Sequence, residues 1–309
     1  MTTIGATSGQ SSQAPLTGER QPNAYRSTMS RWPLVLAAAL LTACQVAGPA
    51  LTHSPARPAV QTQAAKRAVV PAGYYASVES LTGDRLLKGL ATIIGKHKDL
   101  GYDKARDVMF ADLDDTTGKD QVQSVYTGAW ATGVTSSLTA YNKGFNTEHT
   151  WPQSKGAEGV AKADLHHLYS VDAKSNGIRS NNPFGNVVTV LMLLPDVTHS
   201  GQASKLGKDA NGTQVFETPD WHRGDVARSL MYFFVRYATA PKEERGGGPL
   251  TLVNFEVERR ILKAWHDQDP VDANERQRND AIYGLQGNRN PFVDHPEYVD
   301  RVGSPFLPH

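Results

Sequence analysis

Two polar segments of the sequence contain the side chains best suited to chemistry. The first reads NTEHTWPQS and holds Glu148 and His149, and the second reads VDAKSNGIRSN and holds Asn176. An imidazole can take a proton from water near neutral pH, because it titrates there without heavy tuning. A carboxylate and an amide oxygen are hard ligands, which suit a cation such as Mg²⁺ that keeps several waters. Together these residue types indicate metal-assisted hydrolysis of a phosphodiester.

The backbone has to position Glu148 and His149, because neighbours in a regular strand point to opposite faces. We therefore expect this pair at the end of a strand or at a kink. The TWP sequence that follows fits such a place, since proline lacks a ladder donor and restricts the residue before it. We expect Asn176 in the first turns of a short helix capped by Asp172, which would bring its amide to the same edge.

Helical periodicity is the clearest structural signal elsewhere in the chain. Apolar residues recur at helical spacing after Thr82, which predicts a helix over residues 83–96 with Thr82 as its N-cap. Spacing and capping signals predict three more helices, over residues 226–238, over residues 256–266, and behind Asp272, where Glu275 would complete a capping box.

Strand signals are few. A β-rich stretch predicts a short strand around residues 122–126, and a near-continuous apolar run predicts a buried strand over residues 187–194. The turn with Asp112, Asp114 and Asp115 lacks the glycine and terminal glutamate of a calcium loop, so we interpret it as a solvated turn. Several helices and few strands, without regular βαβ alternation, indicate one mostly helical domain of the α+β class.

Composition sets limits on the partners of the chain. Its 309 residues are 39% hydrophobic and 20% charged, which excludes a wholly disordered chain. The formal charge is +1, and without the first 44 residues 29 Lys and Arg stand against 30 Asp and Glu. A nucleic-acid partner would therefore need a local basic groove, and the missing overall basic field counts mildly against a nuclease.

The N-terminal region has the pattern of an export signal. An Arg precedes a short apolar run, which ends in the small residues before Cys44. This ending is similar to a bacterial lipoprotein signal, in which Cys44 would be lipidated and anchored in a membrane. We interpret residues 1–44 as leader and signal, with Met29 as the better start, residues 45–72 as an Ala/Pro-rich tether and residues 73–309 as the domain. Cys44 is the only cysteine, so the domain must stand without disulfides.

Four motifs in order carry a family resemblance. EHTWPQS, DLHHL with VDAKSNGIRSN, GDVARSLMY and QGNRNPFVDHPEYV resemble the bacterial endonuclease I family, in the His-Me finger (ββα-metal) nuclease superfamily, over roughly residues 73–301. The resemblance implies a finger of strand, loop, strand and helix. It implies His149 as general base and Glu148 and Asn176 as ligands of Mg²⁺, with Ca²⁺ or Mn²⁺ as alternative ions. It also implies nonspecific cleavage of DNA, often with RNA, to 5′-phosphate and 3′-hydroxyl ends.

The chain departs from that family in the insert between the two polar segments. Some members place a phosphate-contacting Arg there and are braced by disulfides, whereas the insert KGAEGVAKA offers only Lys155 and Lys162. We take Lys155 and Arg179 as candidates for charge relief, and His166 as a further candidate for substrate binding. For Arg179, a salt bridge that fixes the finger is an equally good interpretation.

Other polar residues of the motifs fit a structural role. Asp164, His166 and His167 in DLHH are more often scaffold than metal ligands in such a finger. We expect Asn288, Arg289 and Asn290 to lock the C-terminal turn against the core, and His295 to be structural.

Three functions follow as hypotheses. The first is an exported, membrane-anchored endonuclease without an obligate protein partner. The second is a non-catalytic lipoprotein on the same fold that binds nucleic acid or the cell envelope. The third is a hydrolase of another phosphodiester, such as a teichoic-type polymer.

Overall fold

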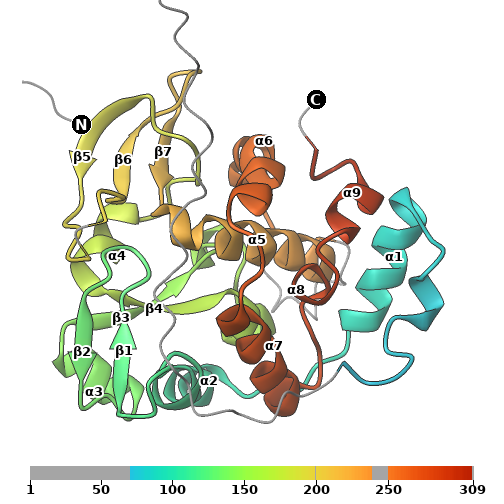
Figure 1. Cartoon of the computed structure of the whole chain (residues 1–309), viewed down its shortest axis with the longest axis horizontal. Helices are drawn as coiled ribbons and strands as arrows, with labels where there is room; N and C mark the ends of the chain where they lie inside the picture. The colour runs from blue at the N-terminus through green and yellow to red at the C-terminus, as the bar shows by residue number, and fades with distance from the viewer. Residues whose placement is uncertain (1–69, 199, 239–249, 308–309) are drawn as a thin grey trace, which may run out of the picture. The chain divides into compact units, whose positions relative to one another are not determined.

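The computed structural model describes residues 70–198, 200–238 and 250–307, and structural statements below refer to these residues. The predictions on residues 1–44, on Met29 and Cys44, and on residues 45–69 of the tether lie outside them. Helices and small sheets are mixed in this part of the chain, in agreement with the α+β class (Figure 1). No helix in the described ranges is both long and apolar enough to cross a bilayer.

The strands form three separate antiparallel sheets, β1–β2, β3–β4 and β5–β6–β7. Their bounds are β1 Gln121–Gln123, β2 Trp130–Thr132, β3 Phe145–His149, β4 Leu168–Asp172, β5 Thr189–Leu193, β6 Lys205–Lys208 and β7 Gln214–Glu217. The helices are α1 Gly83–Ile94, α2 Tyr102–Val108, α3 Ser137–Asn142, α4 Ala173–Arg179, α5 Arg223–Tyr237, α6 Val253–Gln268, α7 Ala273–Gln286, α8 Pro291–Asp294 and α9 Tyr298–Val302.

The β3–β4 hairpin and α4 follow one another in the order of strand, loop, strand and helix. The hairpin register runs from Phe145 opposite Asp172 to His149 opposite Leu168, and α4 begins directly after β4. Asp172 caps α4 as predicted, since its carboxylate accepts a hydrogen bond from the Ser175 amide at 2.9 Å. The backbone order therefore matches the one that the family resemblance implies.

This hairpin lies between two hydrophobic clusters because its side chains alternate between two faces. Tyr169 and Val171 belong to the larger cluster, which is built around α5 and α6, whereas Phe145 and Leu168 belong to the smaller one with Ile282. In α5, 12 of 15 residues are buried, and the helix crosses the centre of the structure with α6 and α8 against it (Figure 1). The site at the hairpin therefore rests on both clusters.

Most predicted helices are confirmed, with shifted ends. The helix over residues 83–96 is α1, which ends at Ile94, and Thr82 stands at its N-cap without a side-chain capping bond. The helices at 226–238, at 256–266 and behind Asp272 are α5, α6 and α7. Asp272 caps α7 through the Glu275 amide at 2.8 Å, whereas the Glu275 carboxylate pairs with Arg228.

Three predictions on strands and turns need correction. The strand near residues 122–126 ends at Gln123, because the chain then turns back and the Ser124 amide donates to the Ala129 carbonyl. In the acidic segment Asp112 is exposed, and Asp115 is partly exposed and accepts bonds from Thr117 and Asp120 of its own turn. Asp114 accepts a bond from the Ser170 amide at 2.7 Å and pairs with Arg278, so it fastens the turn to β4.

The prediction of a buried strand over residues 187–194 is wrong about burial. β5 forms there, but all five of its residues are exposed, and Leu193 is 62% exposed. The reason is its place at the edge of a sheet whose core contacts are made by Val215 and Phe216 of β7. An apolar run alone does not distinguish an edge strand from a central one.

Candidate active site

The end of β3 carries Glu148 and His149, as expected from their positions in the sequence. His149 is the last residue of the strand, and the Thr150 amide closes the hairpin by donating to the His167 carbonyl at 3.0 Å. The TWP turn follows outside the strand. The two candidate side chains therefore project from one strand end.

Glu148 is a buried carboxylate that faces the Tyr126 hydroxyl, and no hydrogen bond of good geometry from the described residues reaches its oxygens. Its side chain is 1% exposed, and its one charged neighbour is Arg179, with Nη1 3.1 Å from Oε1 among the described residues. Burial raises the pKa of Glu148 above its ordinary value, although the Arg179 guanidinium opposes that shift. Buried polar atoms without partners are uncommon, so these oxygens are available as ligands for a cation.

Asn176 offers a second oxygen from α4. Its Nδ2 donates to the Thr147 carbonyl of β3 at 3.1 Å, which fixes the amide and leaves its oxygen as the remaining ligand atom. The described residues contain no cluster of three or more His, Cys, Asp and Glu side chains that could hold a metal. The oxygens of Glu148 and Asn176 are of the hard kind that a cation such as Mg²⁺ takes, with water completing its shell.

His149 is held as a neutral imidazole. Its ring is nearly buried, and burial together with the neighbouring His167 holds the pKa of His149 well below its ordinary value. Nε2 lies 3.2 Å from the Lys162 carbonyl, which only accepts, so Nε2 carries the proton and Nδ1 is free to accept one. Gln153 Nε2 lies 3.5 Å from that Nδ1. The imidazole can therefore act as a general base through Nδ1.

Arg179 connects α4 to the end of β3. Its Nη1 donates to the His149 carbonyl at 3.1 Å, and its Nη2 donates to the Thr150 carbonyl at 2.7 Å. Together with the ion pair to Glu148, these bonds tie the helix to the strand end, and the side chain is only 2% exposed. The geometry agrees with the interpretation of Arg179 as a fixing salt bridge, and a contact to phosphate stays a prediction.

Lys155 and His166 lie among other neighbours. The Lys155 carbonyl accepts bonds from the Trp151 indole at 3.0 Å and the Thr251 amide at 3.1 Å, so this residue sits beside the segment that leads into α6. The His166 ring is 3% exposed and packs against Tyr232 at 4.4 Å. None of the contacts seen in the described residues brings either side chain to Glu148 or His149, and their roles in binding stay predictions.

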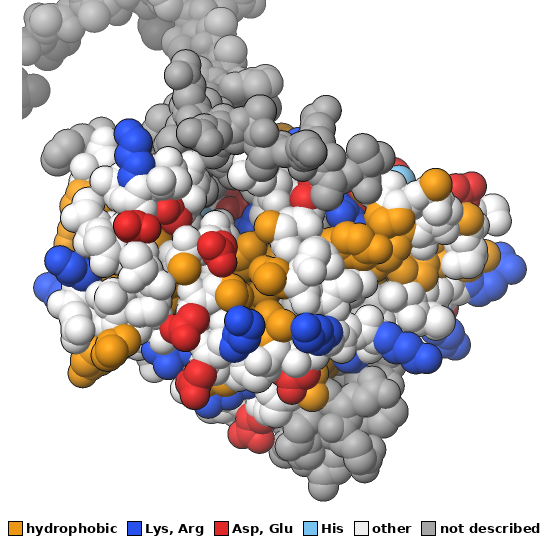
Figure 2. Space-filling model, turned by 90° about the horizontal axis from the view of Figure 1, so that it is seen from below, with side chains coloured by type: hydrophobic (Ala, Val, Ile, Leu, Met, Phe, Trp, Pro, Cys, Tyr) orange, Lys and Arg blue, Asp and Glu red, His pale blue; other side chains and the backbone are white. Residues whose placement is uncertain are grey.

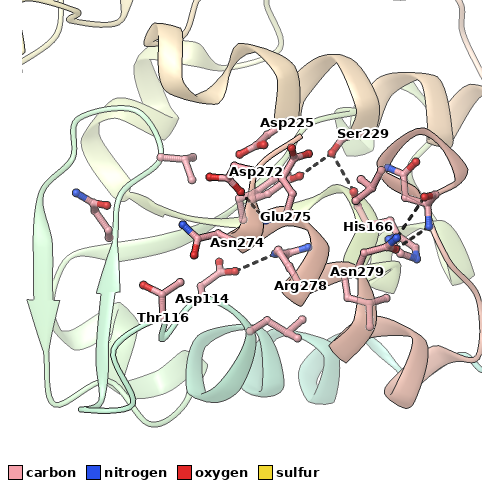
Figure 3. A pocket seen from close by; sticks show the side chains of 17 residues that line it. Asp114, Thr116, His166, Asp225, Ser229, Asp272, Asn274, Glu275, Arg278 and Asn279 are labelled. Carbon is pink, nitrogen blue, oxygen red and sulfur yellow. Dashed lines mark hydrogen bonds and ion pairs between the residues drawn. The ribbon is translucent and has the colours of Figure 1, made fainter. Parts of the chain in front are cut away.

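His166 also lines a separate cavity, shown in Figure 3. Asp114 and Arg278 pair across its floor, and Ser229 donates to the His166 carbonyl at 3.0 Å. Glu275 adds a partly buried carboxylate that is paired with Arg228. Asp114, Glu275 and Arg278 are thus paired within the protein, and the Asp272 carboxylate is used in capping α7.

The expected structural residues have the predicted kind of contacts. Asp164 accepts bonds from Tyr232 and Tyr237, both at 2.8 Å, and His167 Nε2 donates to the Ala161 carbonyl at 2.7 Å. The expected structural residues of the C-terminal turn also make contacts. Asn288 donates to the Ile94 carbonyl and to the Tyr232 hydroxyl, and Arg289 forms ion pairs with Asp280 and Asp294. Asn290 caps α8, and the His295 ring stacks on Tyr298.

Sequence reasoning did not place Tyr102, Gln153 or Lys162 against His149. Tyr102 from α2 lies with its ring centroid 5.6 Å from that of His149, and Gln153 and Lys162 reach the two ring nitrogens as described. No spacing links α2 to the hairpin, so no local signal could have found Tyr102.

The face in Figure 2 shows basic and acidic side chains interspersed, without a broad basic field on that side.

The comparisons with known proteins agree on one family. The sequence profile described as Endonuclease I matches residues 82–297. The chain is 33% identical over 243 residues to an extracellular ribonuclease of Bacillus subtilis (strain 168), covering 74% of this chain and 77% of the relative. It is 30% identical over 244 residues to an extracellular ribonuclease of Bacillus amyloliquefaciens, covering 74% and 77%. An extracellular deoxyribonuclease of Aeromonas hydrophila is 27% identical over 138 residues, covering 43% and 49%. The chain therefore belongs to the endonuclease I family and is a nuclease.

Proposed function

We propose that the chain is an exported, metal-dependent endonuclease that hydrolyses phosphodiester bonds in both RNA and DNA, leaving 5′-phosphate and 3′-hydroxyl ends. The observation that carries this proposal is Glu148, a buried carboxylate whose oxygens no described donor reaches with good hydrogen-bond geometry, beside the fixed amide of Asn176. These two residues would hold Mg²⁺, with Ca²⁺ or Mn²⁺ as alternatives.

The protein's own residues supply the proton transfer. His149 Nδ1 takes the proton of the attacking water, because Nε2 already carries a proton and donates it to the Lys162 carbonyl in a hydrogen bond. Arg179 contacts both the His149 carbonyl and the Glu148 carboxylate, and so fixes their positions relative to each other. A cation bound at Glu148 and Asn176 would neutralise charge on the phosphate and the leaving oxygen.

The breadth of substrate rests on the names of the relatives. Those matched over 74% of the chain are called ribonucleases, and several matched over 43% are called deoxyribonucleases. These names support nucleic acid as the substrate over a teichoic-type polymer, and membership of a nuclease family supports catalysis over binding alone.

The place of action follows from the same relatives and the N-terminal pattern. Relatives are named extracellular or periplasmic, which supports export. We further propose that lipidated Cys44 anchors the chain in a membrane. Labelling cells with a radioactive fatty acid tests this: the wild type should take up label, and Cys44→Ser should not. Label retained by Cys44→Ser would refute the anchor.

Digestion of plasmid and of RNA with Mg²⁺ tests the catalytic proposal. We expect the wild type to cleave both, EDTA to stop cleavage, and His149→Ala and Glu148→Gln to lose at least about 10²-fold in rate. Glu158 is exposed and His295 is partly exposed, and as matched controls Glu158→Gln and His295→Ala should keep the wild-type rate.

Calorimetric titration with Mg²⁺ separates the metal site from the base. Glu148→Gln and Asn176→Ala should weaken metal binding, whereas His149→Ala should leave it unchanged. Full cleavage by His149→Ala, or cleavage by the wild type in EDTA, would overturn the mechanism.

A further inference from the structure

Two cations lie over the ring of Tyr102, which in turn lies beside His149. The Lys162 ammonium lies 4.1 Å from the centroid of the Tyr102 ring, and the Arg106 guanidinium lies 5.2 Å from it. The same ring lies 5.6 Å from the imidazole of His149. Tyr102 thus contacts two cations and the proposed base, and Lys162 is itself a neighbour of that base.

The arrangement of Lys162 is fixed from both ends. Its carbonyl faces His149 Nε2 at 3.2 Å, and its ammonium rests on the Tyr102 ring, which attracts a cation through its negative face. The Lys162 backbone therefore orients the base, and its side chain sets a charge next to it.

These cations form no salt bridge in the described part of the chain, although Asp107 is a charged neighbour of Arg106. The buried Arg106 Nε also has no hydrogen-bond partner there. By contrast, the two terminal nitrogens of Arg179 are engaged by Glu148 and by backbone carbonyls. A cation that is held in place yet unpaired is suited to bind an anionic ligand.

We propose that Lys162 and Arg106, held on the face of Tyr102, form the phosphate-binding pair of this nuclease. Lys162 contacts the non-bridging oxygens of the phosphate that is cleaved, and Arg106 contacts a neighbouring phosphate of the same strand. This proposal rests on the proposed role of His149 as base, since it places Lys162 by that residue. It assigns to Lys162 the stabilisation of negative charge at the cleaved phosphate, a role for which we had named Lys155 and Arg179 as candidates.

The kinetic test compares lysines of the same region. Lys162→Met should lower kcat by about 10²-fold, as losing one group that stabilises transition-state charge does, and Lys162→Arg should recover most of that rate. Arg106→Met should mainly raise KM. Lys143→Met is the matched control, because Lys143 is exposed in the turn before β3 and should keep wild-type kinetics.

The role of the Tyr102 ring in holding the two cations is tested by replacing Tyr102 itself. Tyr102→Phe keeps the aromatic face and should keep kcat, whereas Tyr102→Leu removes it and should shift kcat in the direction of Lys162→Met. Thermal unfolding of each variant identifies any change that comes from lost folding.

A binding measurement gives a readout apart from catalysis. A short DNA duplex is titrated in EDTA at several salt concentrations. Each phosphate contact contributes about 0.9 to the slope of log affinity against log salt, so Lys162→Met and Arg106→Met should each reduce it by about that amount.

The outcomes separate this proposal from the proposed function. A wild type that cleaves nothing contradicts the nuclease mechanism, while the salt slopes still decide the role of the pair. Unchanged slopes and kcat in Lys162→Met would overturn the proposal, and loss of rate in Lys155→Met instead would return the role to that residue.

Discussion

Replacing Asp164 should destabilise the protein far more than an ordinary substitution does. Its buried carboxylate accepts four hydrogen bonds, from the Tyr232 and Tyr237 hydroxyls at 2.8 Å each, from Gln286 Nε2 at 3.0 Å and from the His166 amide at 3.1 Å. These donors come from α5, from α7 and from the loop before β4. Asp164 therefore joins three parts of the chain through one charged group.

The magnitude follows from the donors that Asp164→Ala would leave without an acceptor. Each buried unsatisfied donor costs about 1–3 kcal/mol. Gln286 can fall back on Asn288, whose Oδ1 lies 3.2 Å from its Nε2, so three donors count. Because part of that cost is offset by not burying a charge, we expect a loss of about 3–5 kcal/mol. That is a large share of a typical unfolding free energy of about 5–15 kcal/mol.

Urea unfolding followed by intrinsic fluorescence at neutral pH measures this loss as a lower midpoint with an unchanged slope. Asp164→Asn is the matched control, because it keeps the shape and one acceptor oxygen, and it should lose only about 1–2 kcal/mol. A loss below about 1 kcal/mol in Asp164→Ala would refute the role of this residue as a hub.

The same group predicts a dependence on pH. Burial alone would raise the pKa of Asp164, but nearby histidines, His97 first, and the bond from Gln286 outweigh it and hold that pKa well below its ordinary value. A lowered folded-state pKa stabilises the fold above the unfolded value of about 3.9, and this contribution is lost as the pH falls further. The unfolding free energy of the wild type should therefore drop more steeply below about pH 4 than that of Asp164→Asn, and parallel curves would contradict this.

Three further substitutions test other parts of the structure by urea unfolding. Arg179→Met should lower the free energy of unfolding by about 3–5 kcal/mol and remove most of the activity, because it leaves the buried Glu148 carboxylate without its cationic partner. A stable, active variant would argue against the fixing role. Trp151→Ala should cost about 3–5 kcal/mol, since its indole stacks on Phe233 and Phe255 at 4.7 and 5.7 Å, and a cost below about 1 kcal/mol would show that this contact is dispensable. Leu193→Lys on the exposed edge of β5 should change stability by less than about 0.5 kcal/mol, and a much larger loss would mean that something covers β5.

Local signals predicted the helices well. α5 and α6 were found by their apolar spacing, and the capping of α4 and α7 was found because Asp172 and Asp272 act within three residues of their own positions. Such signals depend only on neighbouring residues, which the sequence displays directly.

Contacts between distant segments were not predictable in the same way. The exposure of β5 depends on which strand of its sheet faces the core, and the bond from the Ser170 amide to Asp114 joins residues 56 positions apart. The site shows the same limit. Glu148 and His149 were chosen as candidates by residue type, whereas the approach of Tyr102 to His149 depends on how α2 packs.

The position of the β3–β4 hairpin between two hydrophobic clusters makes the candidate active site depend on the packing of both. Each face of the hairpin is completed by a different cluster, so neither cluster can loosen without disturbing the strand end that presents Glu148 and His149. Partial unfolding on either side should therefore silence the enzyme before the whole chain is lost. The rate of cleavage is thus a sensitive reporter of the integrity of the entire described fold.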